Sequence, residues 1–279
     1  MRKSIFFVLI GMCLVTQLQA QSASRDSTFH PYRVNYWVTG PLLVAGVAAN
    51  YLGIPAIMEK KAISRLEIEA LDSDVINGFD RWALHQDPAL IDDYLDYSNY
   101  VLAPSVLLPV ALLLDGQIRR DWFDILFMYM ETMSLTSNIY EWTPIGPSYL
   151  NRYRPVTYYD ELDYDARRSG NNRNSFYSGH VASAAASTFF MVKVYSDYHP
   201  GIGNDKYILY AAALVPPAVL GYFRMVSLRH FPSDVLMGIG IGALCGILVP
   251  ELHRISEENI SLGLYTSPEV TGFAVRWTP

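Results

Sequence analysis

Long stretches without charged residues recur along the chain, separated by shorter polar segments. Five of these stretches carry no charged residue at all, namely 34–58, 97–114, 181–192, 207–223 and 235–250. A sixth apolar segment, 122–140, is interrupted only by Asp124 and Glu131. Apolar runs of this length are typical of helices that are apolar on all sides. We therefore predict an all-α fold, a bundle of about six core or transmembrane helices.

Length alone does not decide between these two kinds of helix. Crossing a bilayer takes about 20 predominantly apolar residues, and only segment 34–58 exceeds that length comfortably. The segments are therefore either short transmembrane helices or helices buried on all sides in a large bundle. Hydrophobic residues make up 51% of the chain and charged residues 17%, which excludes a disordered protein. The net charge of −6 argues against nucleic-acid binding.

The first 20 residues resemble a secretory signal peptide. Arg2 and Lys3 precede an apolar stretch, and Ala20 ends a small-residue cleavage sequence. An uncleaved membrane anchor is the alternative. After cleavage Cys245 is the one remaining cysteine, so we expect no intrachain disulfide. We divide the chain into this leader at 1–20, a helical domain at 21–258 with its motifs in 151–234, and a tail at 259–279.

The orientation of these segments in a membrane poses a conflict. The short loop 116–120 carries Arg119 and Arg120 and is expected to be cytoplasmic by the positive-inside rule. Counting back through 97–114 and 34–58 places the start of the mature chain in the cytoplasm as well. A cleaved signal peptide places it in the periplasm. Either the leader is not cleaved conventionally, 34–58 does not cross, or the helices are not membrane spans.

Two further regions differ from the apolar segments. The stretch 59–96 carries charges at short intervals and is predicted to be a helical, polar connection. In the tail, apolar residues alternate with polar ones over 260–264 and 273–277, on either side of a turn sequence that contains Pro268. This period of two predicts a short β-hairpin.

Three polar clusters, at 151–155, 175–180 and 224–234, bring Arg, Ser, His and Asp to the ends of apolar segments. In the second, Ser178 suits a helix N-cap and Gly179 allows close backbone approach. A helix start attracts anions, and His180 follows directly. The alternative is an ordinary capped helix with a surface histidine.

The third cluster combines a histidine, a carboxylate and an arginine. His230 and Asp234 are four residues apart, so a helical turn brings the carboxylate under the imidazole. Such a carboxylate accepts from one ring nitrogen and leaves the other free to attack. Arg224 adds a permanent cation suited to phosphate oxygens. Taken one at a time, the arginines could be ordinary cations next to a membrane, and Asp234 could be an acid at the start of a helix. An accidental cluster is a poor explanation for all of these residues together.

The ordered set of clusters resembles the signature of the type 2 phosphatidic acid phosphatase superfamily, which includes vanadium haloperoxidases and bacterial class A acid phosphatases. That signature reads K-x6-R-P, then P-S-G-H, then S-R-x5-H-x3-D. Residues 154–155 match the end of the first motif, and 178–180 match the second after its proline. Arg224, His230 and Asp234 match the third. The resemblance covers about half of the chain, from the segment that begins at Trp122.

The resemblance implies a role for each matching residue. His230 is expected to attack phosphorus and form a phosphohistidine, with Asp234 orienting it. His180 is expected to protonate the leaving oxygen and then activate water. The expected phosphate-binding groups are those of Arg154, Arg224, Ser178 and Gly179. The resemblance implies no metal and no other cofactor.

Three departures from the signature affect phosphate binding. Pro147 stands where the first motif has its lysine, Tyr177 replaces the proline of the second motif, and Phe223 replaces the serine of the third. One phosphate-binding cation is therefore missing or supplied from elsewhere. The candidates to supply it are Arg152 and Arg173, with Arg167 and Arg168 as weaker ones.

We predict a membrane-embedded lipid phosphatase of the bacterial inner membrane, with its site at the periplasmic face. The resemblance suggests phosphatidic acid, phosphatidylglycerol phosphate, isoprenyl diphosphates and lipid A phosphates as substrates. One alternative is a soluble periplasmic acid phosphatase of the same superfamily, in which the segments form a packed core. A non-catalytic envelope scaffold is an alternative of another class, since the motif lysine is missing. The sequence does not indicate the oligomeric state.

Overall fold

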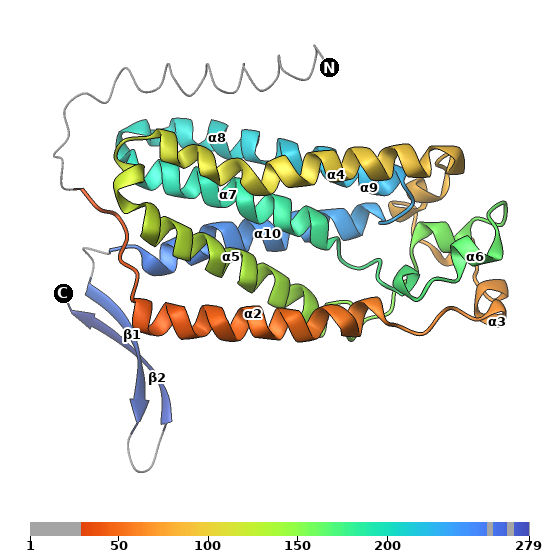
Figure 1. Cartoon of the computed structure of the whole chain (residues 1–279), viewed down its shortest axis with the longest axis horizontal. Helices are drawn as coiled ribbons and strands as arrows, with labels where there is room; N and C mark the ends of the chain where they lie inside the picture. The colour runs from red at the N-terminus through yellow and green to blue at the C-terminus, as the bar shows by residue number, and fades with distance from the viewer. Residues whose placement is uncertain (1–28, 256–258, 267–270, 279) are drawn as a thin grey trace.

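Six helical rods lie side by side along the long axis of the molecule (Figure 1). The computed structural model describes residues 29–255, 259–266 and 271–278. The rods are α2 (Tyr36–Met58), α4 (Ile91–Leu107) continued by η5 (Leu108–Leu114), α5 (Trp122–Trp142), α7 (Gly179–Tyr198), α8 (Lys206–Ala213) with α9 (Val215–Val226), and α10 (Pro232–His253). Each apolar segment of the sequence forms one rod, so the predicted all-α bundle is confirmed.

Short elements connect the rods. The polar stretch after α2 forms α3 (Arg65–Glu69), η2 (Ser73–Val75), η3 (Asp80–Leu84) and η4 (Pro88–Leu90). The remaining connections contain η6 (Ile118–Asp121), η7 (Pro155–Tyr158), α6 (Tyr164–Arg167), η8 (Gly170–Arg173) and η9 (Pro200–Asp205). The expected helical connection is therefore a series of single turns. The leader predicted at 1–20 lies outside the described residues.

The tail forms the predicted hairpin. Strand β1 (Asn259–Thr266) pairs antiparallel with β2 (Thr271–Thr278), with Ile260 opposite Trp277 and Leu264 opposite Phe273. The turn sequence between the strands lies outside the described residues.

Helices α7 and α10 form the centre of the bundle and touch backbone to backbone. A Cβ atom added at Gly238 lies 2.6 Å from the carbonyl oxygen of Ser178, and one added at Gly246 lies 2.5 Å from that of Ala186. At Gly242, midway between them, an added Cβ overlaps the carbonyl oxygen of Ala182. Glycine every fourth residue of α10 therefore sets the distance between the two helices, whose first turns carry His180 and Asp234.

We expect Gly242→Ala to destabilise the fold. The added methyl group forces α7 and α10 apart, and overpacking of this kind costs about 1–3 kcal/mol of unfolding free energy. Gly240 has nothing within 4 Å of an added Cβ, so Gly240→Ala is the control and leaves stability unchanged or slightly raised. Thermal unfolding of both variants in detergent measures the difference. Equal midpoints for the two variants contradict the close contact.

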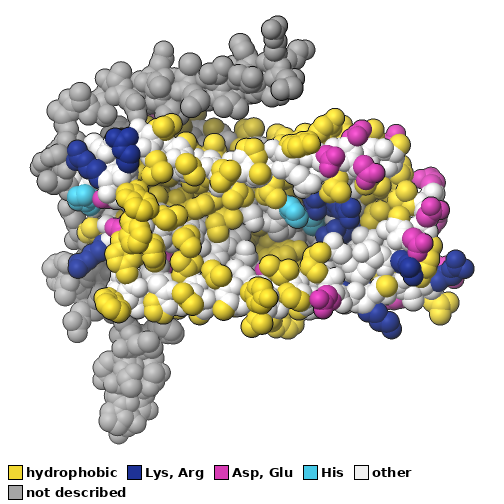
Figure 2. Space-filling view, viewed as in Figure 1, with side chains coloured by type: hydrophobic (Ala, Val, Ile, Leu, Met, Phe, Trp, Pro, Cys, Tyr) yellow, Lys and Arg dark blue, Asp and Glu magenta, His cyan; other side chains and the backbone are white. Residues whose placement is uncertain are grey.

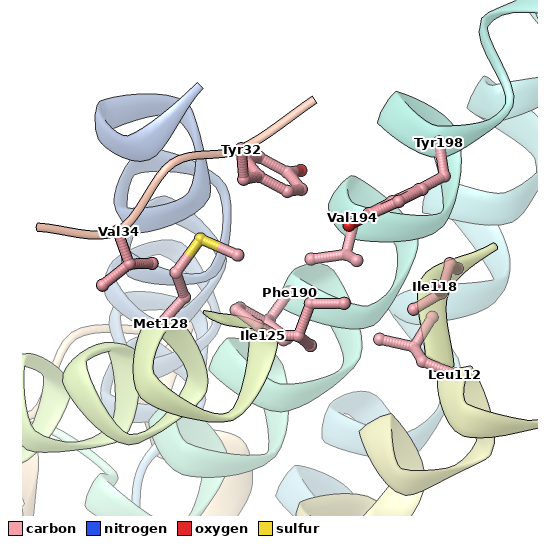
Figure 3. Close-up of a cluster of buried hydrophobic side chains, with 9 residues drawn as sticks. All are labelled: Tyr32, Val34, Leu112, Ile118, Ile125, Met128, Phe190, Val194 and Tyr198. Atoms are coloured by element: carbon pink, nitrogen blue, oxygen red, sulfur yellow. The ribbon is translucent and has the colours of Figure 1, made fainter. Parts of the chain in front are cut away.

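The end of the bundle opposite the three motif clusters is closed by a hydrophobic cluster (Figure 3). Its members are Tyr32, Val34, Leu112, Ile118, Ile125, Met128, Phe190, Val194 and Tyr198. The segment before α2 is fixed there by backbone hydrogen bonds, from Arg33 N to the carbonyl of His253 (2.9 Å) and from Ile255 N to that of Pro31 (2.8 Å). The start of α2 and the end of α10 are therefore held at the same end.

Apolar side chains cover the outward faces of the rods (Figure 2). On α2, Trp37 is 92% exposed, and Val44 and Tyr51 are also largely exposed. Within the described part of the chain, four helices are long and apolar enough to cross a membrane, namely Tyr36–Met58, Pro88–Leu114, Pro200–Val226 and Pro232–His253. Apolar side chains that cover the outer faces of several helices are unusual on soluble monomers. The bundle therefore has the surface of a membrane protein, whereas a packed soluble core predicts polar outer faces.

Candidate functional site

The residues of the three motif clusters meet at one end of the bundle, where α7 and α10 begin and α9 ends. The loop between α5 and α7 contributes the first cluster. Its residues 152–154 run beside 172–175, held by hydrogen bonds from Arg154 N to the carbonyl of Asn172 (2.8 Å) and from Ser175 N to that of Arg152 (3.0 Å). This pairing brings Arg154 next to the start of α7.

His230 lies in the turn between α9 and α10 and is only 1% exposed. The preceding turn is tight, with Leu228 at φ 56°. The Nδ1 atom of His230 lies 2.6 Å from the carbonyl oxygen of Ser175. Because a carbonyl only accepts, Nδ1 carries the proton, and Nε2 keeps its lone pair. Burial and the charges of Arg154 and Arg224 hold the pKa of His230 well below its usual range, with a smaller effect from His180. The ring is therefore neutral.

Asp234 does not make the hydrogen bond to His230 that the four-residue spacing predicted. Its carboxylate lies 3.9 Å from His230 Nδ1. Its Oδ2 atom accepts instead from Ser175 Oγ (2.6 Å) and from the backbone N–H of Phe231 (2.7 Å). The reason is that α10 begins at Pro232, so Asp234 lies in the first turn and turns back to cap the helix. Asp234 reaches His230 through Ser175.

Two buried arginines near the histidines have no carboxylate partner among the described residues. Arg154 is 6% and Arg224 4% exposed. Arg154 donates only weakly, at 3.4 Å, to the carbonyl of Asn174 and to Asn171 Oδ1. Arg224 donates to Ser98 Oγ at 3.4 Å, and its Nε atom has no partner in this part of the structure. Burial and the charge of Arg229 lower the pKa of Arg154 to about 10. Buried cations without counter-ions favour binding of an anion.

The start of α7 faces these arginines. Ser178 occupies the N-cap position as predicted, but its Oγ atom makes no capping bond and has no partner among the described groups. Its backbone N–H donates to the carbonyl of Asp234 (3.1 Å). Gly179 packs against the ring of Tyr140, 3.2 Å from an added Cβ. His180 is exposed. Figure 2 shows basic side chains gathered next to apolar ones on this face of the molecule.

The four cations expected to replace the missing lysine are paired with acids. Arg152 binds Asp80 and Asp234, and Arg173 binds Glu67 at 2.8 Å. Arg167 is paired with Asp160 and Arg168 with Asp165. None of the four therefore matches the buried, unpaired state of Arg154 and Arg224.

A lysine from another part of the chain contacts Pro147, which stands where the first motif has its lysine. Lys60, from the segment after α2, donates to the carbonyl of Pro147 and, at 2.7 Å, to Asn151 Oδ1. Burial, together with the charge of Arg173, lowers the pKa of Lys60. A lysine distant in sequence is therefore held where the first motif departs from the signature.

Several residues around the site were not predicted from the sequence. Tyr140 lies close enough to Arg154 and Arg224 to affect the ionisation of both, yet in the sequence it ends an ordinary apolar segment. The charge of Arg229 also acts on Arg154 and Arg224. In the sequence, its place next to His230 was the only indication that it belongs to the site. Asp80 lies 72 residues before Arg152, and nothing in the sequence pointed to it.

The part of the chain that holds the motifs is similar to a known protein family. A family model described as the PAP2 superfamily matches residues 122–257. Among solved structures, the chain is similar to the "first transmembrane PAP2 type phosphatidylglycerolphosphate phosphatase from Bacillus subtilis", with 18% identity, 78% of this chain and 96% of that chain covered, and a TM-score of 0.42. No curated protein sequence matches the chain. Residues 122–257, which hold every motif described above, are therefore similar to the PAP2 superfamily.

Proposed function

We propose that this protein is a metal-independent phosphatase that removes a phosphate group from a membrane lipid through a phosphohistidine on His230. The observation that carries the proposal is the pair of buried guanidinium groups, Arg154 and Arg224, which have no acid partner in the described structure and whose charges lower the pKa of both histidines. Ser178 Oγ and Arg224 Nε are buried donors without a partner among the same residues. A phosphate group supplies the acceptors that these donors need.

The reaction follows from the placement of the two histidines. Nε2 of His230 attacks phosphorus while the bond from phosphorus to the leaving oxygen breaks. Burial and the charges of Arg224 and Arg154 lower the pKa of His180 to about 3 in the free site. A bound phosphate dianion neutralises these arginines and raises that pKa, so His180 takes up a proton and donates it to the leaving oxygen as the alcohol departs. His180 then takes a proton from water, whose oxygen attacks the phosphohistidine and releases inorganic phosphate with free His230. Arg154 and Arg224 neutralise the charge that builds on the phosphoryl oxygens.

The position of the site favours a lipid substrate. The site lies where α7 and α10 begin and α9 ends, at the end of rods long enough to cross a membrane. A phosphate group bound there lies at the level of the lipid headgroups. The hydrocarbon chains of the same lipid then contact the apolar faces of the rods. Arg119 and Arg120 lie in η6, at the opposite end. The positive-inside rule then supports a periplasmic site.

The proposal is tested with the full chain purified in detergent, with chelator present. We expect phosphate release from phosphatidic acid, phosphatidylglycerol phosphate, an isoprenyl diphosphate or lipid A, with vanadate, a phosphate analogue, as an inhibitor. The best lipid should exceed water-soluble monoesters in kcat/KM by at least about tenfold, because its chains add binding energy. Equal rates with soluble monoesters support the acid-phosphatase alternative. No release from any substrate, or release only with added metal, overturns the proposal.

A further inference from the structure

We infer that the buried Asp80 and the partly exposed Arg152 form an ion pair that positions Asp234 and, through Ser175, the ring of His230, without touching the substrate. The inference rests on the proposed function, because it assigns these residues to the support of the attacking histidine. Asp80 lies in η3, outside residues 122–257 that match the superfamily. The pair therefore joins the first part of the chain to the reaction centre.

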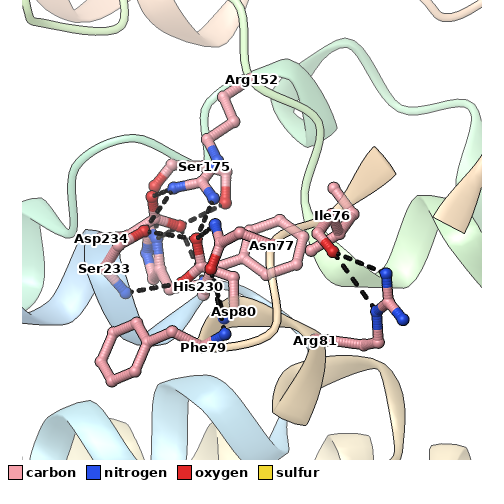
Figure 4. A network of polar contacts seen from close by, with 11 residues as sticks. Ile76, Asn77, Phe79, Asp80, Arg81, Arg152, Ser175, His230, Ser233 and Asp234 are labelled. Atoms are coloured by element: carbon pink, nitrogen blue, oxygen red, sulfur yellow. Dashed lines mark hydrogen bonds and ion pairs between the residues drawn. The ribbon is translucent and has the colours of Figure 1, made fainter. Parts of the chain in front are cut away.

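Asp80 is fixed by bonds to two separate segments. It is 1% exposed, and its Oδ2 atom accepts from Arg152 Nη2 (2.7 Å), Ser233 Oγ (2.8 Å) and Asn77 Nδ2 (2.8 Å). Its Oδ1 atom accepts from the backbone N–H of Ser233 (2.9 Å). Ser233 is in the first turn of α10, so Asp80 provides a carboxylate to that helix start from a distant segment (Figure 4). Such a contact is favoured by the helix dipole.

Arg152 uses both terminal nitrogens in the same network. Nη2 binds Asp80, while Nη1 donates to Asp234 Oδ1 and to Ser233 Oγ (2.8 Å). The guanidinium carbon lies 4.5 Å from the ring centroid of Phe231, in a cation–π contact. This arginine is therefore committed to two carboxylates, unlike Arg154 and Arg224.

The network ends at the nucleophile. Asp234 Oδ2 accepts from Ser175 Oγ, and the carbonyl of the same Ser175 accepts from His230 Nδ1, each at 2.6 Å. Ser175 is fully buried, so its position depends on Asp234, and that of Asp234 depends on Arg152. Figure 4 shows the five residues of this network close together, and the bonds run from Asp80 through Arg152, Asp234 and Ser175 to His230.

The charges of the network match the chemistry at His230. Two carboxylates and one guanidinium leave a net charge of −1 beside a ring that becomes cationic when Nε2 bonds to phosphorus. The network therefore stabilises the transition state and the intermediate more than the bound substrate. Its loss should lower kcat and leave KM nearly unchanged.

The test compares Asp80→Asn, Arg152→Gln and their double variant with the wild-type chain, using the best lipid found above. We expect each single change to lower kcat by about 10–100-fold, as for other groups that orient a reacting residue. KM and the vanadate inhibition constant should stay within about twofold. The double variant should be no slower than the slower single variant, because both changes break one unit.

Glu67→Gln is the matched control. It breaks another arginine–carboxylate pair, between Glu67 and Arg173, which joins the same two regions of the chain but has no contact with Asp234. It should keep kcat within about twofold of wild type. If Arg152→Gln fails to fold, Arg152→Lys replaces it, because a lysine keeps the charge but lacks the fork that binds both acids.

Two outcomes overturn the inference while leaving the phosphatase proposal intact. If Arg152 is a phosphate ligand, its replacement raises KM and the vanadate constant. The pair is not a positioning unit if Asp80→Asn retains the wild-type kcat. The same holds if the fold-loss of kcat in the double variant equals the product of the losses in the two single variants.

A readout independent of turnover separates failure of the inference from failure of the function. In ¹⁵N-histidine NMR of the full chain, the Nδ1–H signal of His230 should move in Asp80→Asn and not in Glu67→Gln. An unmoved signal overturns the inference even if no substrate is found.

Discussion

Replacing His230 with glutamine should lower phosphate release by at least about 10³-fold, because the amide has no lone pair able to attack phosphorus. Glutamine is similar in size and still donates to the Ser175 carbonyl, so the buried site should fold. The wild-type enzyme, quenched during turnover of a phosphate-labelled substrate, should carry label that is lost in acid and kept in base, as for a phosphohistidine. His230→Gln should carry none.

The matched control for His230 is His85→Gln. His85 is exposed and binds only the carbonyl of Arg81 (2.9 Å) in the short turns before α4. Its replacement should change neither the rate nor the labelling. Label that persists in His230→Gln shows that another group is the nucleophile.

Replacing His180 with alanine should slow turnover of a lipid substrate by about 10²–10⁴-fold, the usual contribution of a general acid and base. A lipid alcohol is a poor leaving group and needs the proton that His180 donates. p-Nitrophenol leaves without one, so p-nitrophenyl phosphate should still transfer its phosphate to His230. Hydrolysis of the phosphohistidine then lacks its base. Stopped-flow absorbance should show one equivalent of nitrophenolate released rapidly, followed by slow turnover.

The outcome with His180→Ala discriminates between two roles of this residue. A burst of one equivalent supports proton transfer by His180 in both steps. Equal loss with both substrates and no burst shows that His180 contributes to binding or folding instead. His199→Gln serves as control, since His199 pairs with Asp115 (3.0 Å) at the end of α7 far from the motifs.

The bundle was predictable from sequence because its rods are continuous apolar runs. Each charge-free segment falls in one rod apart from Val34 and Asn35, which precede α2, and α7 extends beyond its run to include Lys193 and Asp197. Both charges are satisfied there, by each other at 2.6 Å. The polar stretch after α2 was predicted less well. Charges at short intervals indicate exposure, but they do not distinguish one long helix from several single turns.

The site was predictable only as far as its residues lie within the motifs. The spacing of His230 and Asp234 is correct for one helical turn, yet a tight turn at Leu228 and a helix start at Pro232 separate the two side chains. Arg152 looked equivalent to Arg154 because both are arginines in one short cluster. Their difference depends on Asp80, which comes from another segment. Partners brought together by the fold, as here, leave no trace in local spacing.

The backbone hydrogen bonds that join Arg33 to His253 and Ile255 to Pro31 have a consequence for finding which side of the membrane each end of the bundle faces. Because α10 begins just after His230 and ends at His253, and is long and apolar enough to cross a membrane, a reporter protein fused after Ile255 should lie in the compartment away from His230. A fusion that is active in the cytosol therefore places the chemistry outside it.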